Sequence, residues 1–227
     1  MSPEKPAPDA RHCRVALIDY EFGNVRSVAN ALEALGAVVQ LSRDEEVLHQ
    51  ADALILPGVG AFADGMANLR RFGLIPVLER LVLDEKKPFL GICVGMQLLA
   101  KTGWEGGHHA GLGWIDAEVV RFEVEQTHNL KVPHVGWNNV RTIRDSALTG
   151  AVDVAHTFYF VHSYYLRCNE PNIVAGTCEY GIEFPAIIQQ GNIHAVQFHP
   201  EKSQKHGLAL LSSFLTLVTT AKESPAC

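Results

Sequence analysis

The stretch PFLGICVGMQLLA, from Pro88 to Ala100, places a cysteine between two glycines at the point where an apolar run changes its period. Residues 89–92 are typical of a short buried strand, whereas residues 96–100 have the pattern of a helix start. GICVG is the cysteine counterpart of the G-x-S-x-G nucleophile elbow, a tight strand-to-helix turn that requires small flanking residues. Such a turn lifts the Cys93 side chain out of the sheet edge and directs a helix N-terminus at the sulfur, which favours the thiolate.

A buried structural cysteine is the alternative interpretation, because free cysteine is among the most buried residue types. A nucleophilic thiolate needs a base, and the base needs a group that orients it. The stretch HAVQFHPEKS offers both, because His199 and Glu201 are two residues apart and face the same way in extended backbone. Pro200 between them disfavours helix at His199. Together with Cys93, these residues predict a Cys-His-Glu triad for acyl transfer through a thioester.

Strand and helix patterns alternate before Cys93. They run in the order strand 14–19, helix 25–35, strand 37–41, a short acidic helix, strand and turn 51–60, helices 63–71 and 74–84, and strand 87–93. This order predicts an α/β fold with an open, mostly parallel sheet and helices on both faces. After Gly103 a glycine-rich loop and alternating runs predict a strand-rich second half, mixed or antiparallel, before a last helix at about 204–221.

The chain has 227 residues, enough for one substantial domain, and neither a repeat nor a linker divides it. Residues 1–13, rich in proline and alanine, are expected to form a mobile tail, and residues 14–222 a single domain. A net charge of −6 gives no sign of a basic surface that would bind nucleic acid or an anionic membrane. Apolar runs fall short of the roughly 20 residues that span a bilayer. Five cysteines without C-x-x-C spacing fit a reducing, cytoplasmic setting.

PFLGICVGMQLL together with FHPE resembles the triad-type (class I) glutamine amidotransferases, over nearly the whole chain after the tail. Within that family, GNVRSVANAL, LPGVGAF, KVPHVGWNNV and FYFVHSYY are similar to the glutaminase subunits of imidazole glycerol phosphate synthases. The resemblance implies that L-glutamine is hydrolysed at Cys93 and that ammonia passes to a cyclase subunit with a (β/α)₈ barrel. This heterodimer would make imidazole glycerol phosphate for histidine biosynthesis, and the glutaminase subunit would need no cofactor.

The resemblance also assigns roles to other positions. It implies an oxyanion hole formed by Gly58, Val59, Gly60 and the N–H of Val94. It implies glutamine contacts from Gln97, His162, Ser163 and Tyr164, of which Gln97 lies one helical turn after the cysteine. Tyr159 and Phe160 are expected to be core residues of the same aromatic strand. It implies a partner interface at Asn24, Arg26, Trp137, Asn138 and Lys202.

One position departs from the subfamily's pattern. The first turn reads DYEFGN, with Glu21 where glycine is expected. If that site has a positive φ, Glu21 must either be strained or change the turn. Either outcome would affect the partner interface near residues 21–24 but not the triad.

Four alternatives stand beside this interpretation. The chain could be the glutaminase of another synthase, such as pyridoxal phosphate synthase, against which PGVG and VPHVGWN count, or a γ-glutamyl hydrolase that acts alone. It could be a non-catalytic interaction subunit, against which the intact Cys93, His199 and Glu201 count. A metal site could use the histidines, but their spacing closes no ligand set, so no metal is predicted. The histidines in question are His108, His109, His194 and His206.

Overall fold

The computed structural model of the protein describes residues 13–152 and 156–223. The predicted tail at residues 1–12 lies outside this part of the chain. Cys13, which the sequence assigned to the tail, is buried in the core, so for this residue the assignment is wrong. Its carbonyl accepts a hydrogen bond from the N–H of Val38 at 2.9 Å, and the sheet's hydrogen bonding therefore begins here.

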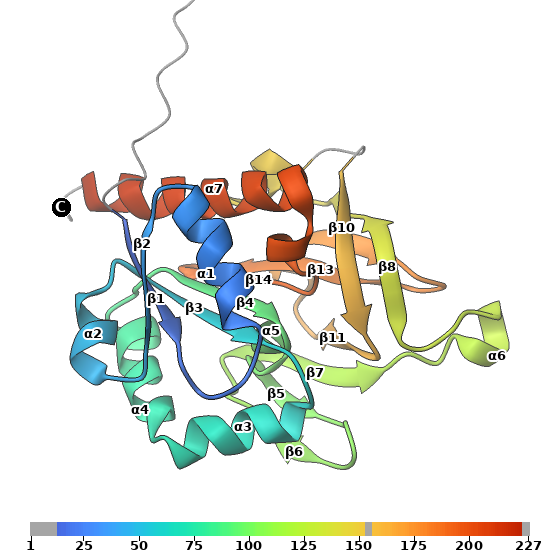
Figure 1. The fold of residues 1–227 in the computed structure, drawn as a ribbon. Coiled ribbons are helices and arrows are strands. Elements are labelled where there is room, and N and C mark those ends of the chain that lie inside the picture. Colours follow the sequence, from blue (N-terminus) through green and yellow to red (C-terminus); the bar gives the residue numbers. More distant parts are fainter. Residues whose placement is uncertain (1–12, 153–155, 224–227) are drawn as a thin grey trace, which may run out of the picture.

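An eight-stranded sheet occupies the centre of the molecule (Figure 1). Its strands are β1 (Arg14–Ile18), β2 (Val38–Ser42), β3 (Ala53–Gly58), β4 (Phe89–Cys93), β9 (Arg141–Thr142), β12 (Val174–Glu179), β13 (Glu183–Gln190) and β14 (Ile193–Val196). They lie in the order β2-β1-β3-β4-β14-β13-β12-β9, parallel as far as β14 and antiparallel beyond it. Every residue of β3 and β4 is buried, as the continuous apolar runs of a parallel sheet require.

Helices cover both faces of this sheet (Figure 1). On one face, α1 (Val25–Ala34) packs against α7 (Gln204–Glu223). The other face carries α2 (Glu45–Gln50), α3 (Phe62–Arg71), α4 (Leu74–Leu78) and the π-helical η2 (Glu79–Asp84). Because the crossovers β1-α1-β2 and β2-α2-β3 lead in opposite directions along the sheet, their helices fall on opposite faces. The predicted open α/β sheet with helices on both faces is confirmed.

The second half adds two smaller sheets. One consists of β11 (Tyr164–Cys168), β7 (Ile115–Arg121), β5 (Ala100–Gly103) and β6 (His109–Ala110), in that order. The other pairs β8 (His134–Asn139) antiparallel with β10 (Thr157–His162). Short helical turns complete the chain: α6 (Glu125–His128), η3 (Thr149–Ala151), η4 (Pro171–Ile173) and η5 (Pro200–Lys202).

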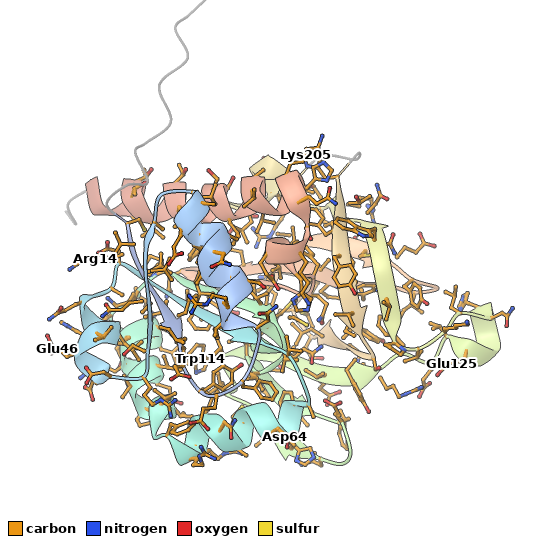
Figure 2. The ribbon with its side chains drawn as sticks, in the orientation of Figure 1. Arg14, Glu46, Asp64, Trp114, Glu125 and Lys205 are labelled. Atoms are coloured by element: carbon orange, nitrogen blue, oxygen red, sulfur yellow. The ribbon has the colours of Figure 1, made fainter. Side chains whose placement is uncertain are left out.

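Apolar side chains from both halves form one contiguous core. Figure 2 shows Trp114 inside the molecule, whereas Glu46, Asp64 and Lys205 project from surface helices. Within residues 13–152 and 156–223, no helix has the length and apolarity to cross a membrane.

The first turn, after β1, contains Glu21 at φ 55°, so the position that departs from the subfamily's pattern has the left-handed conformation that favours glycine. Its carboxylate accepts hydrogen bonds from Arg71 at 2.6 Å and from Arg43 at 3.3 Å. Both guanidinium groups also lie over the ring of Phe72. Glu21 therefore gains two ion pairs that a glycine could not make, and these offset the strain of its backbone.

We expect Glu21→Ala to lower the free energy of unfolding by about 1 kcal/mol, because it keeps the strained φ and loses two exposed ion pairs. Glu21→Gly is expected to recover roughly that amount, because glycine adopts this φ without strain. Urea denaturation of the two variants beside the parent protein checks this. An alanine variant as stable as the glycine variant would contradict it.

Candidate active site

Cys93 ends β4, and a single helical turn, α5 (Val94–Gln97), follows it. The cysteine has φ 55° and ψ −112°, a conformation that is strained for a residue with a Cβ. A Cβ on Gly91 would lie 2.8 Å from the carbonyl oxygen of Gly95, and a Cβ on Gly95 would lie 1.9 Å from that of Leu56. Both glycines of G-x-C-x-G are therefore required by close backbone contacts that hold the strained turn.

The helix after the elbow is shorter than the sequence predicted. The pattern indicated helix to Ala100, but α5 ends at Gln97 and Ala100 begins β5. The carbonyls of Leu98, Leu99 and Ala100 accept hydrogen bonds from the glycine-rich loop at residues 112–115, so they are not available to continue a helix. A single turn aligns few peptide dipoles, so the helix end stabilises charge on Cys93 less than predicted.

His199 and Glu201 form a buried pair behind the cysteine. Nδ1–H of His199 donates to Oε1 of Glu201 at 2.8 Å, and their side chains are 2% and 1% exposed. The backbone of His199 is also held, because its N–H donates to the carbonyl of Tyr159 at 2.9 Å. Ser203 Oγ donates to the carbonyl of His199 at 2.6 Å and accepts the N–H of Tyr159 at 2.9 Å. These contacts fix the ring with Nε2 free to exchange a proton.

The charge state of His199 follows from its neighbours. Burial by itself would lower the pKa of His199, but interactions with Cys93 and then Glu201 outweigh it and raise this pKa to about 10. Nε2 of His199 is buried and has no geometric hydrogen-bond partner among the described residues. The arrangement is therefore suited to an imidazolium beside a thiolate, with the proton on Nε2 available to a leaving group.

The raised pKa of His199 predicts a pH dependence. We expect the activity of this site to fall on an alkaline limb near pH 10, where the imidazolium loses its proton. Because this folded-state pKa exceeds the unfolded value of 6.5, the pair stabilises the fold fully below pH 6.5, and this stabilisation is lost as the pH rises through about 10. Glu201→Gln should move the alkaline limb of kcat/KM to lower pH, because it removes one interaction that raises the pKa of His199. An unmoved limb would contradict this.

A cavity of about 290 Å³ opens beside the sulfur. It is lined by Val59, Gly60, Cys93, Val94, Gln97, Glu105, Pro133, Val161, His162, Ser163, Tyr164 and His199. The structure therefore brings the cysteine and histidine together with the positions predicted for the oxyanion hole and for glutamine. Gly58 is not in the lining, but it lies opposite Cys93 in the register of β3 and β4.

The PGVG loop packs against the first turn of the chain. Gly60 has φ 129°, and a Cβ there would lie 2.8 Å from the ring of Phe22. The hydroxyl of Tyr20 donates to the carbonyl of Pro57 at 2.6 Å, and burial, followed by the nearby Cys93, raises the pKa of this phenol. A Cβ on Gly58 would lie 2.7 Å from the amide nitrogen of Gly95, so loop and elbow touch without side chains between them.

Glu105 and Gln197 are two polar residues at the site that the sequence analysis missed. Glu105 is the acidic residue of the cavity lining, and its Oε2 accepts the first N–H of α3, from Phe62, at 2.8 Å. Gln197 is fully buried, and its Nε2 donates to Sγ of Cys93 at 3.8 Å. Glu105 lies in a glycine-rich loop whose path no local pattern predicts. Gln197, two residues before His199, was within the quoted motif, and its polarity in an otherwise apolar run was the available signal.

A chain of hydrogen bonds leads from the cavity to the opposite end of β8. Nδ1–H of His162 donates to the carbonyl of Tyr164 at 2.8 Å, so its Nε2 accepts from Nδ1–H of His134, 3.1 Å away. Nε2 of His134 in turn lies 3.4 Å from the amide nitrogen of Asn138. Burial lowers the pKa of His134 to about 4 and that of His162 to about 3, so both rings are neutral at pH 7. This chain of hydrogen bonds fixes the tautomers of His134 and His162.

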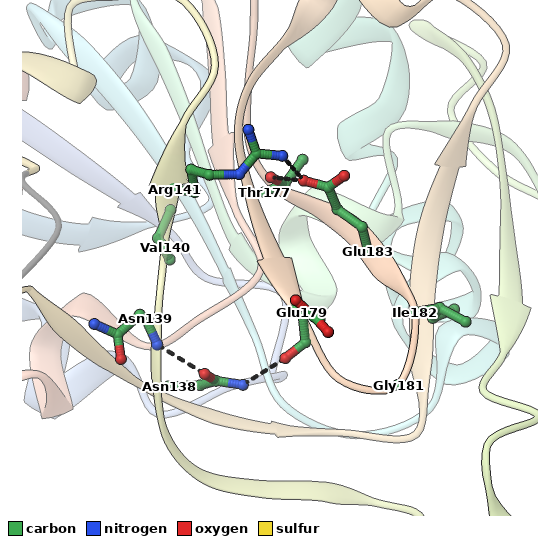
Figure 3. Close-up of a pocket in the computed structure, with 9 residues that line it drawn as sticks. All are labelled: Asn138, Asn139, Val140, Arg141, Thr177, Glu179, Gly181, Ile182 and Glu183. Atoms are coloured by element: carbon green, nitrogen blue, oxygen red, sulfur yellow. Dashed lines mark hydrogen bonds and ion pairs between the residues drawn. The ribbon is translucent and has the colours of Figure 1, made fainter. Parts of the chain in front are cut away.

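Asn138 also faces a second hollow, of about 570 Å³, between β8–β9 and the β12–β13 hairpin. Figure 3 shows its amide bridging to the carbonyl of Glu179, while Arg141 and Glu183 pair with each other on another side. Asn138, Arg141 and Glu183 are thus engaged with other protein groups around this hollow, whereas Cys93 lines the other cavity.

Of the predicted interface residues, Trp137 and Lys202 both lie beside the ring of Tyr159, whereas the amide of Asn138 bonds the carbonyl of Glu179 and Asn24 is the N-cap residue of α1. Trp137 is 47% exposed and its ring lies 6.0 Å from that of Tyr159, over which the ammonium of Lys202 lies at 5.7 Å. Phe160 is fully buried, so its prediction as a core residue is confirmed. The same prediction for Tyr159 is wrong, because Tyr159 is only half-buried beside Trp137 and Lys202. The N-terminal turn of α1, with the exposed Arg26, belongs to a helix that packs against η5, the turn containing Lys202.

The histidines considered as metal ligands fall in different elements, apart from the adjacent His108 and His109. His194 is buried in β14, His206 contacts Thr157, and His108 lies against Trp104. Within the described ranges, no three His, Cys, Asp or Glu side chains come together in a group that could hold a metal ion.

Comparison with known proteins agrees with this geometry. The class-I glutamine amidotransferase family model matches residues 16–217. The chain is 47% identical over 203 residues to imidazole glycerol phosphate synthase subunit HisH 1 of Campylobacter jejuni strain RM1221, covering 89% of this chain and all of that one. It is 48% identical over 207 residues to the HisH subunit of Moorella thermoacetica, covering 91% and 96%.

Solved structures agree on the fold. PurLQS from Thermotoga maritima matches with a TM-score of 0.71 at 18% identity, over 90% of this chain and 98% of that one. A putative GMP synthase subunit from Thermoplasma acidophilum matches with a TM-score of 0.68 at 19% identity, over 93% and 96%. With the elbow, the buried His–Glu pair and the shared cavity in place, the chain belongs to the class-I glutamine amidotransferase family.

Proposed function

We propose that this chain is the glutaminase subunit of an imidazole glycerol phosphate synthase, which hydrolyses L-glutamine and delivers ammonia to a cyclase subunit with a (β/α)₈ barrel. The observation that carries the proposal is the buried His199, bonded to Glu201 on one side and coupled to the Cys93 thiol on the other, at the wall of one cavity. The identity of 47% to a HisH subunit over its full length supports the choice of synthase. A cytoplasmic setting and one domain over residues 14–222 belong to the same proposal, supported by the contiguous core.

In the proposed reaction, the thiolate of Cys93 attacks the carboxamide carbon of glutamine. The negative charge that develops on the carbonyl oxygen is stabilised by backbone N–H groups of the PGVG loop and of Val94. The imidazolium of His199 protonates the nitrogen as the C–N bond breaks, which releases ammonia and leaves a γ-glutamyl thioester. His199, now neutral, takes a proton from water as the water attacks the thioester, and glutamate leaves. Glu201 keeps the ring oriented and stabilises its charge.

Substrate recognition follows from the other cavity residues. The carboxylate of Glu105 is suited to the α-ammonium of glutamine, because it is the acidic group of the lining. We propose that Gln97, Ser163 and Tyr164 hold the rest of the amino acid. Both ring nitrogens of His162 already have protein partners. His162 therefore contributes through its backbone and by holding the Tyr164 carbonyl.

The test is glutamate release from glutamine by the purified chain, alone and with the cyclase subunit and its nucleotide ligand. Strong stimulation by the partner and formation of imidazole glycerol phosphate are expected. Equal turnover with and without the cyclase would favour a hydrolase that acts alone. Stimulation by a pyridoxal phosphate synthase subunit instead would reassign the partner. Inactivity in every mixture would favour a non-catalytic interaction subunit.

The interface part of the proposal predicts a graded effect on affinity for the cyclase. Trp137→Ala should weaken binding by about 10- to 100-fold, because large exposed aromatic residues dominate interface energies. Lys202→Ala should weaken it by a few fold and reduce the stimulation of glutaminase activity. Trp104→Ala is the matched control, since Trp104 is also 47% exposed but lies elsewhere. Titration calorimetry measures all three, and a Trp137 variant that binds like the Trp104 variant would disprove this interface.

A further inference from the structure

Gln197 lies between the end of β14 and His199, and its side chain is completely buried. Its N–H is bonded to the carbonyl of Ala186 at 3.0 Å, so the backbone is anchored to β13. From this position Nε2 lies 3.8 Å from Sγ of Cys93, with the geometry of a donor to sulfur. A buried amide costs free energy unless its groups are bonded, so this orientation requires an explanation.

The orientation of the Gln197 amide follows from Gln97. The amide group of Gln97 lies 2.9 Å from the carbonyl oxygen of Tyr164, which can only accept, so the nitrogen Nε2 must face it. The second proton of that nitrogen points at Oε1 of Gln197, 3.0 Å away. Gln197 thus presents its oxygen to Gln97 and its NH₂ group to the sulfur. The backbone carbonyl of Tyr164 therefore determines, through two amides, that Cys93 faces a donor.

A thiolate at Cys93 has two other sources of stabilisation. The helix α5 is only one turn long, and the ring of His199 interacts with the sulfur, although its Nε2 makes no geometric hydrogen bond in the described structure. Cys93 is 3% exposed, so a thiolate there meets water only through the small part of its surface that faces the cavity. A hydrogen bond to the charged form of a group favours that form, and it is stronger where water is excluded.

We propose that Gln197 acts directly on the reacting sulfur: its NH₂ group donates to Cys93 and stabilises the thiolate before glutamine binds. Gln97 acts through it as a positioning residue, because its own amide holds Gln197 in the donating orientation. The proposal rests on the proposed function, in which Cys93 is the nucleophile. It makes Gln197 a second side chain, beside His199, that activates this cysteine. Proton transfer is unchanged, since Gln197 donates a hydrogen bond and releases no proton.

The experiment is the pH profile of Cys93 alkylation by iodoacetamide, followed on the Cys93 peptide by mass spectrometry. Iodoacetamide reacts with the thiolate and needs neither glutamine nor the cyclase, so the result is independent of the overall reaction and partner. The cavity beside the sulfur gives this small reagent access. Cys168 and Cys178 serve as internal references, because burial raises the pKa of each thiol to about 12 and keeps both slow to react near neutral pH.

In Gln197→Leu, the pH of half-maximal alkylation is expected to rise by about one unit, because a hydrogen bond to a charged group is lost. In Gln197→Glu, which is isosteric, the pH of half-maximal alkylation should rise further because a carboxylate then faces the sulfur. This variant tests the proposal if the leucine variant does not fold. Gln97→Leu should shift this pH in the same direction by a smaller amount. In the complex, Gln197→Leu should lower kcat about tenfold with little change in KM.

Two control variants separate this role from general destabilisation. Asn192→Ala removes an amide that donates to the carbonyls of Val82 and Lys87 at 2.8 and 2.9 Å, far from the cysteine in the sheet register. Gln190→Leu makes the same substitution at the start of the β13–β14 turn. Both should keep the parent alkylation profile. A parent-like profile in folded Gln197→Leu and Gln197→Glu would overturn the proposal, as would equal shifts in the controls.

Discussion

Cys93→Ala is expected to reduce glutamate release by about 10⁴-fold or more, because no other group can form the thioester. His199 and Glu201 would keep their hydrogen bond, since neither depends on the sulfur for its position. Association with the cyclase should be retained, because the predicted interface lies on α1, η5 and β8, outside the elbow. Ammonium salts supplied directly should restore product formation, since the variant lacks only the source of ammonia. The measurement is glutamate release alongside synthesis from glutamine and from ammonium.

Cys168→Ala is the matched control for this result. Cys168 lies on β11, its pKa is raised to about 12 by burial, and it is outside the cavity lining. It should retain parental activity. If Cys93→Ala still hydrolysed glutamine at a comparable rate, a thioester at this position would be ruled out, and the chemistry would belong elsewhere.

Gly95→Ala is expected to have the second large effect, on folding and on activity together. Its Cβ would lie 1.9 Å from the backbone oxygen of Leu56, and no rotamer change can relieve a clash between a Cβ and a backbone oxygen. The elbow must then move away from β3, which separates Cys93 from the PGVG loop. We expect a loss of more than about 3 kcal/mol in the free energy of unfolding, and loss of glutaminase activity in whatever folds.

Gly150→Ala provides the comparison, because nothing lies within 4 Å of the added Cβ and its φ is not positive. Its free energy of unfolding should stay within about 0.5 kcal/mol of the parent value. Urea denaturation and glutamate release measure both variants. A Gly95 variant that folds normally and remains active would show that the elbow tolerates a side chain, against the close contact with β3.

The sequence alone was enough for features that depend on neighbours along the chain. Alternating strand and helix patterns predicted the open sheet, because burial on both faces requires continuous apolar strands. The elbow followed from Gly91, Cys93 and Gly95, since a tight turn can be recognised from adjacent small residues. The pairing of His199 with Glu201 followed from their separation by two residues, which needs only extended backbone. Strain at Glu21 was only a condition in the sequence analysis, drawn from the glycine that the subfamily has there, and the structure supplied the positive φ.

The tertiary structure decided what depends on residues distant in the chain. Gln197 is 104 residues from Cys93, and its role depends on β14 lying beside β4 and on the orientation of Gln97. Glu105 reaches the cavity only because a glycine-rich loop folds back to cap α3. The same loop ends α5 by taking the carbonyls that would have continued the helix. Local pattern specifies backbone form and near neighbours, whereas contacts across strands depend on strand order, which the sequence pattern did not determine.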